Sequence, residues 1–129
     1  MRKSLNKNER LKSRKQIEFL FRSGQRFNVS LLRVFYVISE TETNEGRIRL
    51  QFGVGASSRV FKKAVDRNRI KRLGRESWRL QKHILEAMPG KQKMQLAVFF
   101  IYTGKELPDY RQMYAATTEA IQKLLARIK

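Results

Sequence analysis

The side chains best suited to chemistry are concentrated in residues 61–79, FKKAVDRNRIKRLGRESWR. Guanidinium groups dominate this segment, and a guanidinium offers a planar fork that grips two phosphate oxygens and also stacks on bases. On a helix, side chains three or four residues apart stand about 5–6 Å from one another, which suits a row of phosphates. A helical wheel gathers one polar face from Arg67, Asn68, Lys71, Arg72, Arg75, Arg79 and Lys82. This face predicts binding to a polyanion through several phosphate contacts.

The charge balance of the whole chain supports this interpretation. The 129 residues include 29 Lys and Arg against 11 Asp and Glu, a formal net charge of +18. Residues 1–15 contribute +6 and residues 59–82 contribute +8, so two short blocks hold most of the excess. Such concentrated positive charge indicates a nucleic-acid surface. No apolar run approaches the roughly 20 residues that span a bilayer, and we expect no membrane association.

The length suits one domain, and we expect a single domain over residues 1–129 with a mobile basic N-terminus over residues 1–10. Periodicity and turn signals predict six elements: a helix between Ser13 and Gly24, strands at Val29–Ile38, Arg47–Val54 and Met94–Tyr102, a long helix at Val60–Ala87, and a last helix after Pro108. We expect the first two strands to pair as a hairpin. The order α-β-β-α-β-α predicts an α+β fold, a two-layer α/β sandwich.

The two long helices are predicted to pack by one face each. On the Val60–Ala87 helix the apolar side is predicted to hold Phe61, Val65, Leu73, Leu80, Ile84 and Ala87, with Trp78 at its edge. On the last helix the predicted stripe holds Tyr110, Met113, Tyr114, Thr117, Ile121, Leu124, Leu125 and Ile128. The basic face of the first helix is therefore expected to remain available to a partner.

Protein-based catalysis finds little support in the residues. The one histidine, His83, has no evident partner, and Asp66 and Glu76 are embedded among cations where they suit ion pairs. With no cysteine, thiol nucleophiles and thiolate metal sites are excluded. We assign no catalytic residue, no metal ligand and no cofactor to the protein. Two alternatives stay open at this point, a structural ribosomal or RNA-chaperone protein and a DNA-binding regulator, although the second lacks a visible helix-turn-helix.

One motif adds a family resemblance. The stretch AVDRNRIKRLGRE, residues 64–76, resembles the signature of the bacterial ribonuclease P protein component. The similarity extends upstream through LKSRKQIEFLFRSG at residues 11–24, Val34-Phe35-Tyr36 and Gly53-Val54, and covers residues 10–125. The chain departs from the family pattern in residues 57–63, which lack a glycine before the helix, and at Ile17, where the family usually has Phe.

The resemblance implies a fold and a function. The implied fold is ribosomal-protein-like, with an unusual left-handed βαβ crossover. The implied role is that of a cytoplasmic RNA-binding subunit, which assists a catalytic RNA in removing the 5′ leader from precursor tRNA. Hydrolysis then occurs at an RNA active site holding Mg²⁺, and no further protein partner is required.

The resemblance also implies two sets of site residues. The basic helix region is expected to bind the catalytic RNA through Lys62, Lys63, Arg67, Asn68, Arg69, Lys71, Arg72, Arg75 and Arg79. A cleft between the first helix and the sheet is expected to bind the single-stranded leader, with Ile17, Phe21, Arg33 and Tyr36 as its residues. Aromatic platforms suit a leader of arbitrary sequence, because every base has a π-face.

Overall fold

A computed structural model describes residues 10–11, 13–42, 44 and 46–128. The mobile N-terminus expected over residues 1–10 therefore lies outside the described residues, except for Arg10. The elements are α1 (Arg14–Ser23), β1 (Gln25–Val29), β2 (Leu32–Glu40), β3 (Arg49–Ala56), α2 (Ala64–Gln81), α3 (His83–Glu86), β4 (Met94–Tyr102) and α4 (Tyr110–Ile128). The predicted α+β order is confirmed, with the short β1 and α3 added to it.

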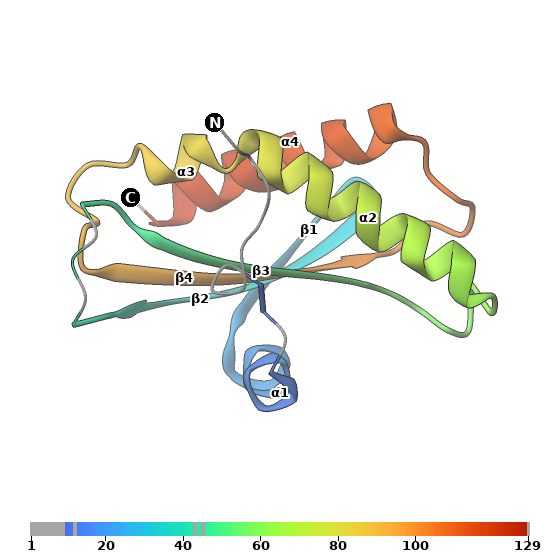
Figure 1. The fold of residues 1–129 in the computed structure, drawn as a ribbon, viewed down its shortest axis with the longest axis horizontal. Coiled ribbons are helices and arrows are strands. Elements are labelled where there is room, and N and C mark those ends of the chain that lie inside the picture. Colours follow the sequence, from blue (N-terminus) through green and yellow to red (C-terminus); the bar gives the residue numbers. More distant parts are fainter. Residues whose placement is uncertain (1–9, 12, 43, 45, 129) are drawn as a thin grey trace.

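The helices cover the sheet unequally (Figure 1). Helices α2, α3 and α4 lie on one face, and α1 lies alone on the other. The main core fills the space beneath α2 and α4, whereas a small second cluster of Leu11, Leu20, Phe35 and Ala97 fixes α1 to the sheet. The sheet is thus sealed on one face and only partly covered on the other.

The strand order β1-β2-β4-β3 corrects the predicted hairpin. Strands β2 and β3 do not pair, because β4 lies between them, antiparallel to β2 and parallel to β3. The continuous apolar run of β4 suits this central place, since its side chains are covered on both faces. The connection from β3 through α2 to β4 is a parallel βαβ unit, and its left-handedness stays a prediction.

The hairpin that does form joins β1 to β2; the predicted strand Val29–Ile38 ran through its turn, and residues 25–28 were not predicted as a strand. The chain reverses at Ser30 and Leu31, where Leu31 has a φ of 66°. An apolar residue in this left-handed region carries none of the Gly, Asn or Asp signals that mark a turn.

The buried stripe of α2 differs from the predicted one. It comprises Ile70, Gly74, Ser77, Trp78 and Gln81, whereas Val65 is 69% exposed. Trp78, predicted at the helix edge, is fully buried, and its ring stacks on Phe52 at 4.5 Å between centroids. The prediction failed because polar residues occupy the contact with α4: the Gln81 amide donates to the Tyr114 carbonyl at 3.1 Å, and its oxygen accepts from Thr118.

Candidate RNA-binding surface

The predicted basic residues lie on the outer side of α2 and on the segment just before it. Lys62, Lys63, Asn68, Arg69 and Arg72 are exposed. Half-buried positions are occupied by Arg67, Lys71, Arg75 and Arg79. Because the opposite side of α2 packs on the sheet and α4, one helix presents a row of cations held at fixed helical spacing.

Arg67 has a role that the sequence did not reveal. Its guanidinium donates to the carbonyl oxygens of Phe61 at 2.7 Å and Lys62 at 3.0 Å. Lys63 stands at the N-cap without a side-chain cap, so Arg67 ties the entering segment to the first turn of α2 instead. Arg67 therefore orders the lead-in that carries Lys62 and Lys63.

Arg79 is also engaged within the protein. Its guanidinium lies 3.4 Å from the Glu76 carboxylate, one turn earlier on α2. This pair neutralises the C-terminal end of the basic row. Arg69 and Arg72 are exposed on the same helix, where they are well placed to meet an external anion.

On the other face of the sheet, α1 lies over an aromatic cluster of Phe21, Phe35 and Phe99, which we call the aromatic floor. Phe35 of β2 and Phe99 of β4 are neighbours in register, and Phe21 of α1 contacts both rings, with centroids 4.7 Å and 5.3 Å away. Phe21 keeps 38% of its surface exposed, so the cluster is open to a ligand. Ile17 packs half-buried against the same cluster.

Tyr36 is not part of this cleft, and its predicted placement is corrected. Successive side chains of a strand point to opposite faces, so Phe35 faces α1 while Tyr36 faces α4. Tyr36 is only 6% exposed in the main core, where its ring lies 5.9 Å from Phe27. The neighbouring Phe35 holds the cleft position.

Cations border the aromatic floor on the β1 side. Arg26 pairs in register with Phe35, and Arg33 pairs with Ile101, so both project from the face that carries α1. Arg33 is exposed, as its predicted cleft role requires, and its Nε donates to the Asn28 side chain at 3.4 Å. Arg26, which the sequence analysis did not select, stands one position across the sheet from the aromatic cluster.

On the opposite side, the floor runs to the edge strand β3, whose outer edge forms a bridge with Arg10 and accepts a hydrogen bond from the Leu11 amide at Phe52. Gly53 is the register neighbour of Phe99, and a Cβ at Gly53 would lie 2.7 Å from the Phe99 ring. The ring thus occupies the space that a side chain would need. The Leu11 carbonyl oxygen also lies 3.1 Å from this Cβ position, so Gly53 is buried between Phe99 and Leu11.

A groove of about 370 Å³ follows this edge and joins the two candidate surfaces. Ile17 and Phe99 line its α1 side, and Lys71 and Arg75 line its α2 side. Burial and the nearby charge of Arg10 lower the pKa of Arg75, but a guanidinium titrates so high that it stays protonated at neutral pH. A ligand in the groove would therefore touch an aromatic surface and a cationic helix together.

Among the described residues, no three His, Asp or Glu side chains gather as a metal-binding group would require. No described helix is long and apolar enough to cross a membrane.

The fold and these surfaces define a class of protein, a basic α+β nucleic-acid-binding domain. The sequence family model described as Ribonuclease P matches residues 5–129. The chain is similar to the ribonuclease P protein component of Porphyromonas gingivalis, with 37% identity over 125 residues, covering 96% of this chain and 85% of the relative. Similarity to the ribonuclease P protein component of Chlorobaculum tepidum reaches 30% identity over 131 residues, covering 95% and 84%.

Solved structures agree on the fold. The RNase P protein of Staphylococcus aureus has a TM-score of 0.63 at 17% identity, covering 92% of this chain and 96% of that one. The RNase P protein of Thermotoga maritima has a TM-score of 0.60 at 22% identity, covering 94% and 98%. The chain belongs to the ribonuclease P protein component family, which confirms the resemblance inferred from residues 64–76. Membership assigns it to ribonuclease P, and thereby to tRNA processing and RNA binding.

Proposed function

We propose that this chain is the RNA-binding subunit that helps a catalytic RNA remove the 5′ leader from precursor tRNA. The observation that carries the proposal is the groove along β3, which connects the aromatic floor under α1 to the cations of α2. One surface suits a single strand and the other suits a folded RNA, and the groove makes them continuous.

The leader is proposed to lie across the aromatic floor. Phe21, which is 38% exposed, and the half-buried Phe99 offer ring surface to bases of any identity, and the buried Phe35 supports the ring of Phe21. Arg26 and Arg33 stand at the β1 border, where they can neutralise phosphates of the same strand. Single-strand binding without sequence readout uses this combination of rings and cations.

The catalytic RNA is proposed to bind α2. The exposed cations Lys62, Lys63, Arg69 and Arg72 present a fixed row, and Asn68 adds an amide between them. Lining up like charges destabilises an isolated helix, and a polyanion relieves that repulsion while releasing counterions. Lys71 and Arg75 face the groove, where they lie between the two RNA partners.

Chemistry is assigned to the RNA, with Mg²⁺ at the RNA active site and no ion held by the protein. The proposed partners are therefore the catalytic RNA and precursor tRNA, without a further protein, in the cytoplasm. The contribution of the chain is to hold the leader and to screen phosphate repulsion. That contribution should matter most when magnesium is scarce, because few other cations then screen the RNA.

Reconstitution tests this proposal. The protein is added to a ribonuclease P RNA at low magnesium, and cleavage is measured with precursors whose leaders are too short or long enough to reach the floor. We expect stimulation that is larger for the longer leader. Cleavage by the RNA-free protein, or no effect of the protein on the RNA, would contradict it, and equal binding to unrelated structured RNAs would favour an RNA chaperone.

A further inference from the structure

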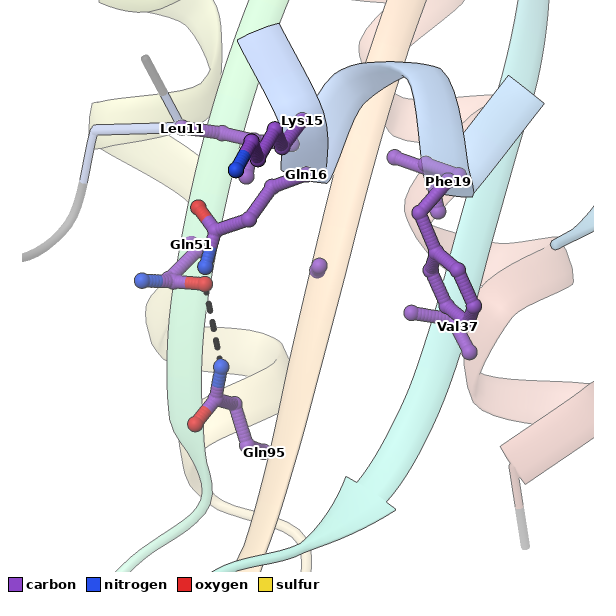
Figure 2. Close-up of a pocket in the computed structure, with 9 residues that line it drawn as sticks. Leu11, Lys15, Gln16, Phe19, Val37, Gln51 and Gln95 are labelled. Carbon is purple, nitrogen blue, oxygen red and sulfur yellow. Dashed lines mark hydrogen bonds between the residues drawn. The ribbon is translucent and has the colours of Figure 1, made fainter. Parts of the chain in front are cut away.

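A second hollow, of about 290 Å³, lies on the other side of α1 (Figure 2). Phe19 and Phe21 are two residues apart, which places them about 200° apart around a helix. Phe21 therefore reaches the aromatic floor, while Phe19 lines this second hollow beside Val37 of β2. Leu11 lines both hollows, whereas Phe19, Gln51 and Gln95 line only the second.

The walls of the second hollow differ chemically. Figure 2 shows Phe19 and Val37 on one side of β4 and Gln16, Gln51 and Gln95 on the other. The Gln95 amide donates to the Gln51 oxygen at 3.0 Å, which orients both carboxamides. Ala97 lies between the two walls in register with Val37 and Gln51, and its small side chain leaves the middle open.

The hollow is also positively biased. Lys15 lines it, and none of its described lining residues carries a carboxylate. Arg49 is the register neighbour of Gln95 and projects from the same face of the sheet. An anionic group attached to the occupant would therefore find cations close to the rim.

Together these walls match one kind of ligand. A nucleobase has two apolar faces, an edge of hydrogen-bond donors and acceptors, and a phosphate attached through its sugar. A phenylalanine ring complements the face, and carboxamides both donate to and accept from base edges. An apolar peptide side chain would cover the remaining donors and acceptors of the carboxamides without bonding to them, at a cost that disfavours it.

We propose that the hollow between Phe19 and the Gln51–Gln95 pair is a binding site for a single unpaired nucleobase of RNA. Phe19 stacks on the base, the glutamines meet its edge, and Lys15 contacts the phosphate. This inference rests on the proposed function only in taking RNA as the ligand, because none of its residues belongs to the aromatic floor. It gives α1 an RNA contact on each flank.

Nuclear magnetic resonance of the isotope-labelled full chain tests the proposal, with a short unstructured RNA oligonucleotide and each nucleoside monophosphate as probes. We expect saturable shifts of the Gln51 and Gln95 side-chain amide signals. Phe19 is 50% exposed, so Phe19→Ala should fold normally. It should abolish these shifts and weaken RNA binding about 5- to 150-fold, the effect of losing one base stack. Tyr110→Ala is the control, because Tyr110 is a 40% exposed aromatic residue on α4, on the other face of the sheet, and this variant should keep them.

The outcomes separate this site from the proposed function. Shifts at Phe21 and Phe35 without shifts at Gln51 and Gln95 would overturn the nucleobase site and leave the proposed leader surface intact. Glutamine shifts that persist in Phe19→Ala would overturn the site as well. An oligonucleotide that shifts none of these signals would count against both.

Discussion

The ring of Phe21 lies 4.7 Å from the ring of Phe35, tilted by 48°, and so couples α1 to the second strand of the sheet. Phe99 completes the contact by meeting Phe21 edge-on at 5.3 Å. Such tilted and edge-on pairs stabilise packing beyond simple area burial. A helix of 10 residues is too short to be stable alone, so this contact also holds α1 in place.

The first prediction concerns that contact. Phe21→Ala should reduce affinity for leader-bearing precursor tRNA about 5- to 150-fold, the loss of one base stack, while affinity for mature tRNA changes much less. Tyr36→Phe is the control, because Tyr36 lies in the core on the opposite face. Equal losses of affinity for precursor and mature tRNA would show that the leader does not bind this surface.

The second prediction concerns the exposed cations of α2. Arg69→Ala with Arg72→Ala should weaken binding to the catalytic RNA and flatten the log–log salt dependence by about 1.4, since each phosphate contact to a single-strand-like site contributes about 0.7. Arg111→Ala, an exposed arginine on α4, provides the control. An unchanged slope in the double variant would show that these two side chains neutralise no phosphate.

The third prediction separates the structural role of Arg67 from direct RNA contact. Arg67→Ala removes the hydrogen bonds to the Phe61 and Lys62 carbonyls, and we expect a loss of about 1 kcal/mol of local stability. Hydrogen exchange should then accelerate at the amides of residues 61–67, with Asn68→Ala as the neighbouring control. Weaker RNA binding with unchanged exchange would mean that Arg67 contacts RNA itself.

The fourth prediction tests the corrected packing of α2. Trp78→Ala should lower the free energy of unfolding by about 3–5 kcal/mol, because the fully buried ring fills the space between Phe52 and Phe100. Val65→Ala on the same helix should change it by less than about 0.5 kcal/mol, since Val65 is exposed. Denaturant titration followed by circular dichroism measures both free energies of unfolding. Similar losses for the two variants would support the apolar stripe predicted from the sequence, which includes Val65.

The fifth prediction concerns alkaline pH. Burial, and secondly the charge of Glu106, raise the pKa of Tyr102 above its ordinary value of 10.0. The folded state therefore favours the neutral phenol, which donates to the Glu106 carbonyl at 2.7 Å. This stabilisation is complete below pH 10 and is lost as pH rises through the higher pKa of the folded state.

Tyr102→Phe provides the comparison. It should be about 1 kcal/mol less stable than the parent at neutral pH, because the hydrogen bond is gone. The difference between the two proteins should shrink above pH 10, where the unfolded parent loses its phenolic proton. A constant difference across that range would rule out the titration of Tyr102 as its cause.

Local signals predicted the elements well and their partners poorly. Ser13 does accept from the Gln16 amide at the start of α1, and β4 spans Met94–Tyr102 as its apolar run predicts. Pairing was predicted from chain proximity, but the long apolar run of β4 takes the place between β2 and β3. The order of the strands along the chain does not reveal that β4 lies between β2 and β3.

The predictions of site residues also succeeded where local spacing decides and failed where tertiary packing decides. Helical spacing predicts a cationic face on α2, and the structure exposes Asn68 and Arg72 of that face, whereas Arg67 is half-buried and bonds to two carbonyls. The choice between Phe35 and Tyr36 depends on which face of β2 meets α1, and both faces of that strand carry apolar residues. Hydrophobicity cannot decide between two buried faces, so the aromatic floor needed the three-dimensional structure.

The place of β4 also has a consequence for biosynthesis. A ribosome completes β3 and the arginine-rich helix before residues 94–102 are made, yet β3 obtains its full hydrogen-bonded ladder only from those residues. Until then the nascent chain carries its whole polycationic segment without the scaffold that orders it. Translation that stopped before residue 94 would yield an unfolded polycation that binds RNA nonspecifically rather than a folded subunit.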